Sequence, residues 1–129
     1  MKEVVSQGCF IAHSGSFFRW KRIFLGASFF YMTPNWQKAV RAHELGHIEG
    51  HHTEWRILTL LFCPFLFFWV CRKQEFLADE YAAKLGLRAE LINFLEKLYT
   101  PSGRMYPSNF DRIEKLRLIP VKDKLACSA

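Results

Sequence analysis

The stretch AHELGHIEGHH, residues 42–52, decides how the rest of the chain is interpreted. It contains His43 and His47 four residues apart, with Glu44 directly after the first histidine. Residues four apart lie on the same face of a helix, so both imidazoles can reach one metal ion. Glu44 lies at the edge of that face, where its carboxylate can orient a water molecule and take its proton. The HExxH pattern therefore predicts a helix with a catalytic Zn²⁺ site, and a polar helix face with surface histidines is the alternative.

The third metal ligand is sought further along the chain. His51 lies one turn beyond the pair on the same helix and is poorly placed to close a tetrahedral site, so we interpret it as a neighbour of the ligands or a surface residue. A longer zincin pattern requires a glycine and then a histidine after the second ligand. Gly50 matches this pattern, but Thr53 stands in the histidine position and excludes it.

A later acidic pair supplies the missing carboxylate. Glu75 and Asp79 are four residues apart and share a face of the helix that we expect there. Glu75 is the expected third ligand, and Asp79 is expected to accept a hydrogen bond from a ligand histidine and so to fix its tautomer. The alternative is a solvated acidic face.

The local sequence predicts one strand and four helices. Thr33 is expected to cap a helix in which Pro34 takes the first position, and Ser108 is expected to cap another. Gly46 allows a second segment to pass close to the metal side of its helix, and Gly86 is an expected C-cap. The expected elements are a strand at 23–31, helices at 34–55, 74–86, 88–98 and 109–118, and a loop at 100–103.

Residues 57–71 form an apolar run between Arg56 and the cations Arg72 and Lys73. As one helix the run reaches roughly 22 Å, which is short of the ~30 Å hydrocarbon layer of a bilayer. Three structures are open: a buried core helix, a helical hairpin bent at Pro64, and an interfacial or membrane-embedded element. We expect membrane association through this run, with a soluble cytoplasmic protein as the alternative.

The composition indicates one domain, residues 1–129, with an excess of apolar surface. Half of the residues are hydrophobic, thirteen are Phe, and the formal net charge is +6. This charge suits an anionic membrane surface or an acidic partner, but no basic run with stacking aromatics supports nucleic-acid binding. We expect no secretory signal peptide. The cysteines have no metal-ligand spacing and indicate a reducing compartment: Cys9, Cys63, Cys71 and Cys127.

With both motifs in place, the sequence resembles the membrane zinc metallopeptidases of the HtpX stress-protease and CAAX prenyl endopeptidase type. The matching stretches are AHELGHIEGHH (42–52), EFLADEYAAKLG (75–86) and YPSNFDRIEKL (106–116), within a likeness that covers roughly 23–118. The resemblance implies an α+β zincin-like fold, mostly helical, with a small sheet and a short hydrophobic helical insert at 57–71. It also implies an edge strand that holds an extended peptide or protein substrate beside the zinc. We expect the active site to lie in the cytoplasm.

The third matching stretch departs from the family at one position. Tyr106 stands where the family usually has a histidine, and its hydroxyl can donate a hydrogen bond to a developing oxyanion or merely pack. Arg112 matches a family arginine that pairs with acidic residues near the site, and an ordinary helix cation is its alternative.

The sequence thus predicts a zinc-dependent endopeptidase in which zinc and Glu44 activate water. Two alternatives remain open. The first is a non-catalytic, basic, membrane-binding protein with a structural or inactive metal site. The second is a zinc-dependent hydrolase or chaperone-like module that acts on something other than a peptide.

Overall fold

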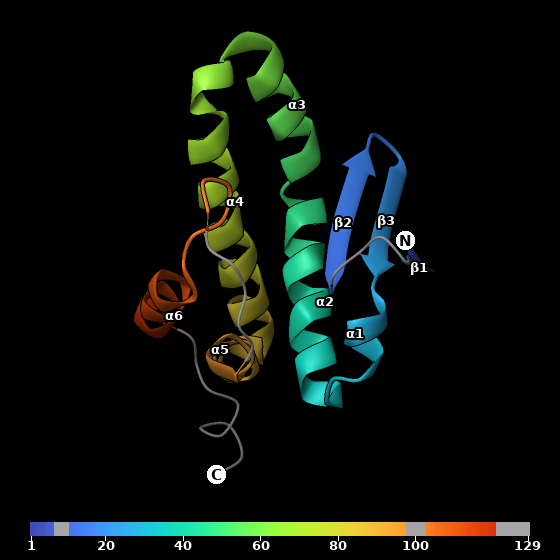
Figure 1. Cartoon of the computed structure of the whole chain (residues 1–129), viewed down its shortest axis with the longest axis vertical. Helices are drawn as coiled ribbons and strands as arrows, with labels where there is room; N and C mark the ends of the chain where they lie inside the picture. Colours follow the sequence, from blue (N-terminus) through green and yellow to red (C-terminus); the bar gives the residue numbers. More distant parts are fainter. Residues whose placement is uncertain (7–10, 98–102, 121–129) are drawn as a thin grey trace.

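The computed structural model describes residues 1–6, 11–97 and 103–120, in which a small sheet lies beside a group of helices (Figure 1). This mostly helical structure agrees with the predicted α+β class. The elements in chain order are β1 (Lys2–Val5), β2 (Ala12–Phe17), β3 (Trp20–Leu25), α1 (Ala27–Phe30), α2 (Pro34–Glu49), α3 (His52–Phe62), η1 (Pro64–Leu66), α4 (Phe67–Ala82), η2 (Ala83–Leu87), α5 (Arg88–Lys97) and α6 (Asn109–Leu118).

The sheet has the strand order β1-β3-β2, with β1 parallel and β2 antiparallel to β3. The strand predicted at 23–31 is wrong in its second half, because β3 ends at Leu25 and the chain turns into α1. The helical turn is closed by a 3.1 Å hydrogen bond from the Phe29 amide to the Gly26 carbonyl. It places the Phe29 ring entirely inside the core, which an extended chain there does not do.

Helix α2 begins as predicted and ends earlier than predicted. The Thr33 hydroxyl accepts a 3.4 Å hydrogen bond from the Trp36 amide, and Pro34 takes the first helical position. The helix ends at Glu49 instead of residue 55, because His51 adopts a left-handed conformation with φ 52°. Helix α3 then starts in a new direction at His52.

The apolar run at 57–71 is a helical hairpin, one of the three predicted structures. Its arms are α3 and α4, and they meet at η1, which Pro64 begins. Helix α4 starts at Phe67 and so extends the helix predicted from residue 74 towards the N-terminus. Within the described part of the chain, no helix has both the length and the hydropathy to cross a bilayer.

Helices α2 and α4 pack closely, and Gly46 makes this possible. A Cβ atom added at Gly46 would lie 3.0 Å from Ala78 Cα and 3.0 Å from Tyr81 Cβ, so a side chain there would push the helices apart. The predicted close approach at Gly46 is therefore confirmed. It brings the face of α2 that carries the histidines against the face of α4 that carries the acidic pair.

The C-terminal helices follow the sequence prediction closely. Gly86, with φ 83°, lies in η2 and turns the chain from α4 into α5. Ser108 caps α6 by accepting a 3.1 Å hydrogen bond from the Asp111 amide, as expected. Residues 98 and 100–102 of the predicted helix end and loop, and Cys9 and Cys127, lie outside the described residues.

Helix α2 is central to the fold, because it packs against β2 and β3 as well as against α4 and α5. The hydrophobic core fills the space around it, and its largest buried side chains are Ile23, Leu25, Phe29, Val40, Ile48, Leu91, Phe94, Leu95 and Leu116. The histidines of α2 point away from this core towards α4.

Candidate metal centre

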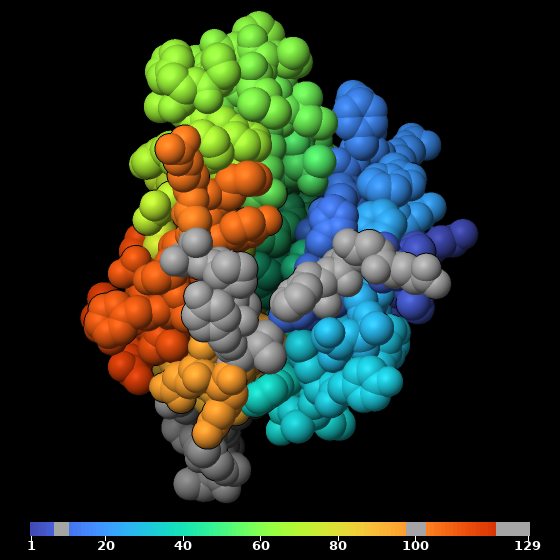
Figure 2. All heavy atoms as spheres, in the orientation of Figure 1, coloured from blue at the N-terminus to red at the C-terminus, as the bar shows by residue number. Residues whose placement is uncertain are grey.

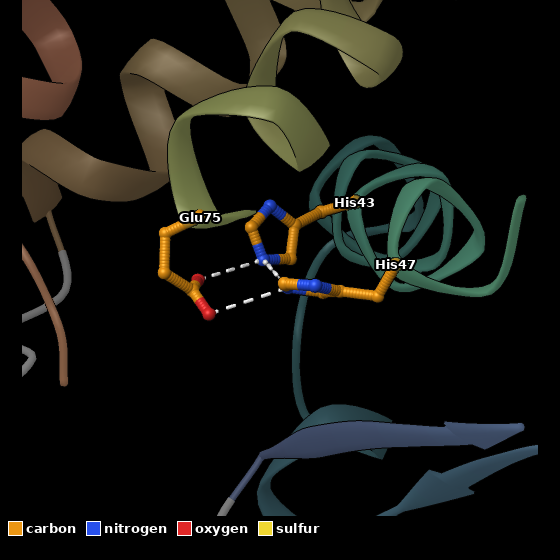
Figure 3. A group of neighbouring side chains, drawn as sticks. All are labelled: His43, His47 and Glu75. Carbon is orange, nitrogen blue, oxygen red and sulfur yellow. Dashed lines mark hydrogen bonds and ion pairs between the residues drawn. The ribbon is translucent and has the colours of Figure 1, made fainter. Parts of the chain in front are cut away.

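Two histidines from α2 and one glutamate from α4 converge in the structure (Figure 3). His43 Nε2 lies 3.2 Å from Glu75 Oε2, and His47 Nε2 lies 3.3 Å from Glu75 Oε1. The two Nε2 atoms are 3.1 Å apart. All three side chains are buried, so the three predicted ligands form one enclosed group.

The spacing of these atoms fits a metal ion. Metal–ligand bonds of ~2.0–2.2 Å in a tetrahedral arrangement place neighbouring ligand atoms roughly 3.3 Å apart. The observed separations of 3.1 to 3.3 Å agree with that value. Two imidazoles and a carboxylate suit several divalent metals, so the geometry supports a metal site without choosing the metal.

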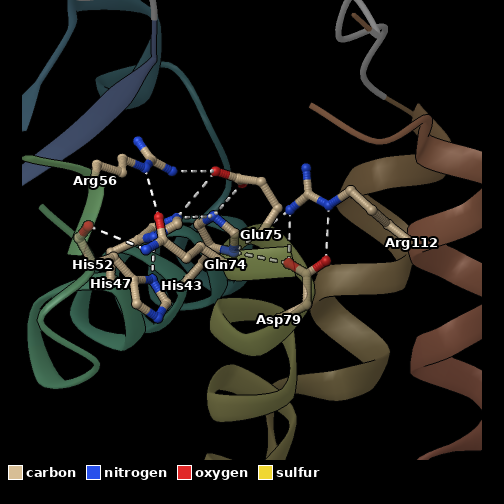
Figure 4. Close-up of polar contacts among 8 residues, drawn as sticks. All are labelled: His43, His47, His52, Arg56, Gln74, Glu75, Asp79 and Arg112. Atoms are coloured by element: carbon tan, nitrogen blue, oxygen red, sulfur yellow. Dashed lines mark hydrogen bonds and ion pairs between the residues drawn. The ribbon is translucent and has the colours of Figure 1, made fainter. Parts of the chain in front are cut away.

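Asp79 and Arg112 hold the first ligand from behind (Figure 4). Asp79 Oδ1 lies 2.8 Å from His43 Nδ1, which leaves Nε2 facing the other ligands. Arg112 donates two hydrogen bonds to the same carboxylate, from Nε to Oδ2 at 2.8 Å and from Nη2 to Oδ1 at 2.7 Å. Burial raises the pKa of Asp79, but the adjacent Arg112 outweighs it and holds that pKa below its usual value. Asp79 is therefore ionised and can orient His43, the role that the spacing predicted for it.

The ligands His43 and Glu75 shift each other's pKa values when no metal is bound. Burial opposes protonation of His43, but its hydrogen bonds to Asp79 and Glu75 outweigh burial and raise its pKa to about 10. Burial likewise raises the pKa of Glu75, but His43 and His47 outweigh it and hold that pKa well below the usual range. The buried carboxylates thus keep a positive charge beside them, and a metal cation can replace the proton.

His52 contacts the second ligand and was missed by the sequence analysis. Its Nδ1 lies 2.7 Å from His47 Nδ1, and its carbonyl accepts a 3.1 Å hydrogen bond from Gln74. Burial, and then His47 and Arg56, lower the pKa of His52 to about 4, so its ring is neutral and its Nδ1 can accept a hydrogen bond from the Nδ1–H group of His47. On a continuous helix His52 would point away from the site. The helix break at His51, which follows the C-cap residue Gly50, brings the His52 ring back towards His47.

Arg56 was also missed as part of the site. Its Nη2 lies 3.4 Å from Glu75 Oε1, and its Nε donates a 2.6 Å hydrogen bond to Gln74 Oε1. These contacts connect α3 to α4 across the base of the hairpin (Figure 4). His51, in contrast, is exposed and lies 3.5 Å from Glu54 Oε1, away from the ligand group.

The predicted catalytic residues border a cavity of about 400 Å³ beside the ligands. Glu44 is only 8% exposed, yet it makes no hydrogen bond or ion pair with any other residue that the structure describes. Tyr106 is 48% exposed and lines the same cavity. Burial, and then the charge of Glu75, raise the pKa of Tyr106, so its hydroxyl keeps its proton at neutral pH.

Another part of the cavity wall comes from residues 11–14, which lead into and form the start of β2. Within the described residues β2 pairs with β3 alone, so no strand covers its other edge, where the Ser16 amide donates a 3.4 Å hydrogen bond to Thr53 Oγ1 of α3. An unpaired edge presents backbone N–H and C=O groups that an extended chain can bind. The cavity thus combines a metal-ligand group, an unpaired carboxylate and a free strand edge.

Comparison of the chain with protein-family models, curated protein sequences and solved structures finds no match. The family resemblance of the quoted motifs therefore stays a prediction.

Proposed function

We propose that this protein is a zinc-dependent endopeptidase with a minimal zincin-like core. The observation that carries the proposal is the position of Glu44, whose nearly buried carboxylate has no partner among the described residues and borders the cavity beside the ligand group. A carboxylate that ends in a cavity beside a metal-ligand group, with no ion pair holding it, is free to contact water or substrate there, as a general base must.

His43, His47 and Glu75 would hold the ion. Zinc, when bound, would supply Lewis acidity towards a peptide carbonyl and towards water, without redox chemistry. The protein's part is to hold the histidine ligands in position, with the Nε2 atom of each facing the other ligands. Asp79 does this for His43, and His52 does it for His47, through the contacts at their outer nitrogens.

Glu44 would act first as a general base and then as a general acid. Its carboxylate takes a proton from the attacking water as the water oxygen bonds to the peptide carbonyl carbon. The same proton then passes to the amine nitrogen as the C–N bond breaks. Tyr106 would donate a hydrogen bond to the oxyanion that forms between these steps.

The substrate would bind as an extended peptide along the free edge of β2. Strand addition uses main-chain hydrogen bonds, so it holds many sequences in one register. Ala12 and Ser14, on β2, line the cavity together with Glu44. A peptide paired with this part of the strand would therefore pass beside the metal centre.

The test is cleavage of casein by zinc-loaded wild-type protein and by Glu44→Gln. The variant should keep one equivalent of zinc and lose cleavage by roughly 10²- to 10⁴-fold, because the ligands remain while the general base is gone. Glu49→Gln is the matched control, since Glu49 lies on the same helix with an exposed side chain. Turnover by Glu44→Gln at the wild-type rate would remove this mechanism.

A further inference from the structure

The tip of the α3–α4 hairpin is an exposed apolar surface. Its most exposed side chains are Phe65, Phe62 and Leu61, which are 81%, 76% and 71% exposed. Figure 2 shows the hairpin projecting as one end of the molecule. Other exposed apolar side chains on this tip are Ile57, Leu58, Leu60, Leu66, Phe68 and Trp69. The helical hairpin therefore leaves uncovered most of the run that the sequence marked as a candidate membrane element.

A second apolar turn lies at the same end of the molecule as the hairpin. The turn between β2 and β3 exposes Phe17, Phe18 and Trp20, and Figure 1 shows it at the same end of the molecule as the hairpin. Ser16 fixes the two together, because its hydroxyl donates a 2.7 Å hydrogen bond to Glu54 at the start of α3. We call the two turns, residues 17–20 and 57–71, the apolar end.

The charged residues within the apolar end, or directly flanking it in sequence, are all cations: Arg19, Lys21, Arg22, Arg56, Arg72 and Lys73. Asp and Glu are absent from residues 4–43 and from residues 55–74 of the sequence. Three cations lie over aromatic rings of the apolar end. Arg22 is 5.4 Å from the ring centroid of Trp20, Lys73 is 4.9 Å from that of Trp69, and Arg104 is 5.9 Å from that of Phe68. Aromatic rings with adjacent cations are typical of segments at the membrane–water interface.

The cations of the hairpin lie at one level below its tip. Arg56 precedes the last residue of α3, Phe62, by six positions, and Lys73 follows the first residue of α4, Phe67, by six. Six helical residues span about 9 Å, so both cations are about 9 Å from the bend. This matches the ~5–10 Å to which an interfacial element buries its apolar face.

We propose that the apolar end docks on an anionic lipid surface, with the hairpin tip among the upper acyl chains and the cations at the level of the phosphates. A second copy of the chain, the other candidate occupant, would bring the same cations together, whereas anionic headgroups complement them. Arg56 also contacts Glu75, so the metal centre lies at the level of the headgroups. The docking does not rest on the proposed peptidase activity.

Flotation with lipid vesicles tests this docking. Wild-type protein should float with vesicles of phosphatidylcholine and phosphatidylglycerol, and far less with phosphatidylcholine alone. Phe62→Ser/Phe65→Ser should reduce binding to the mixed vesicles more than tenfold, because both side chains are exposed and leave the core unchanged. Phe110→Ser is the matched control, since Phe110 is 72% exposed on α6, outside the apolar end, and should bind as wild type does.

A charge-reversal variant tests what the cations contribute to vesicle binding. Arg72→Glu/Lys73→Glu should lose more than tenfold in binding to the anionic vesicles, because each cation near such a surface contributes about 1 kcal/mol. Lys38→Glu/Lys97→Glu, which changes exposed cations on α2 and α5, is the matched control and should keep most of the binding.

Three results would overturn the proposal. The first is wild-type protein that stays in the aqueous fraction with both kinds of vesicle. The second is equal loss in the tip variant and in Phe110→Ser. The third is a wild-type protein that does not float and that forms a stable dimer in analytical ultracentrifugation, which Phe62→Ser/Phe65→Ser dissociates. That result would mean that the tip contacts a second copy of the chain. Glu44→Gln should float as wild type does, so a failure of the peptidase proposal is distinguishable.

Discussion

Replacement of Glu75 by alanine should weaken zinc binding more than any other single carboxylate change in this chain. Glu75 is buried, and its two oxygens lie 3.2 Å and 3.3 Å from the Nε2 atoms of His43 and His47. Loss of a residue that only orients a ligand costs ten- to a hundredfold in metal affinity. Glu75 supplies a donor atom itself, so the loss should exceed about a hundredfold, or about 2.8 kcal/mol.

The assay is competition for zinc between the protein and a chromophoric chelator at fixed pH. Glu80→Ala is the matched control, because Glu80 lies on the same helix and pairs at the surface with Lys84. His51→Ala should also bind zinc nearly as tightly as wild type. Circular dichroism checks that each variant is folded. Full zinc affinity in Glu75→Ala, together with loss in His51→Ala, would refute the assignment and place the whole site on one segment.

Four further predictions follow from the same geometry. Asp79→Asn and His52→Ala should each weaken zinc binding roughly ten- to a hundredfold in the competition assay, and unchanged affinity would exclude an orienting role. Since the pKa of His43 is about 10 without metal and binding displaces that proton, zinc affinity measured by calorimetry should rise about tenfold per pH unit between about pH 7 and 9; a flat profile would contradict the coupling. Gly46→Ala should destabilise the fold by about 1–3 kcal/mol in urea unfolding, because its Cβ would lie 3.0 Å from Ala78 Cα; wild-type stability would mean that the helices separate freely. A chelator should abolish casein cleavage while most of the helical circular dichroism remains, whereas unfolding would favour a structural metal.

Some helix boundaries could be predicted from the local sequence alone, and others could not. Thr33 and Ser108 cap their helices as predicted, because a side-chain oxygen that accepts from a backbone amide needs only neighbouring residues. The break at His51 was not predicted, although Gly50 directly before it is the C-cap of α2 and leaves space for the His52 ring. Residues 27–30 read as a strand from their composition, and burial of Phe29 made them helical.

The sequence likewise predicted some residues of the candidate site and missed others. His43 and His47 share a helix, so their spacing alone brings them together. Glu75 and Asp79 were predicted from a second motif, and the structure brings that motif to the first across Gly46. His52 was not predicted, because its contact with His47 requires the helix break, and Arg56 was not predicted, because its contact with Glu75 requires the hairpin. Contacts that depend on a change of chain direction are not encoded in periodicity.

The apolar run at 57–71 was ambiguous for a physical reason. Its length and composition suit a buried helix, a hairpin or an interfacial element equally well, because all three need apolar side chains. The structure selects the hairpin, and the exposure of Phe62 and Phe65 then raises the question of what covers them.

The central claim is that one zinc ion, held by the ligand group, makes this chain a peptidase. Titration of zinc into the metal-free protein, with casein cleavage measured at each step, tests it most directly. Cleavage should rise with added zinc and saturate at one equivalent. A folded protein that binds one equivalent of zinc and cleaves no peptide at any zinc concentration would contradict it.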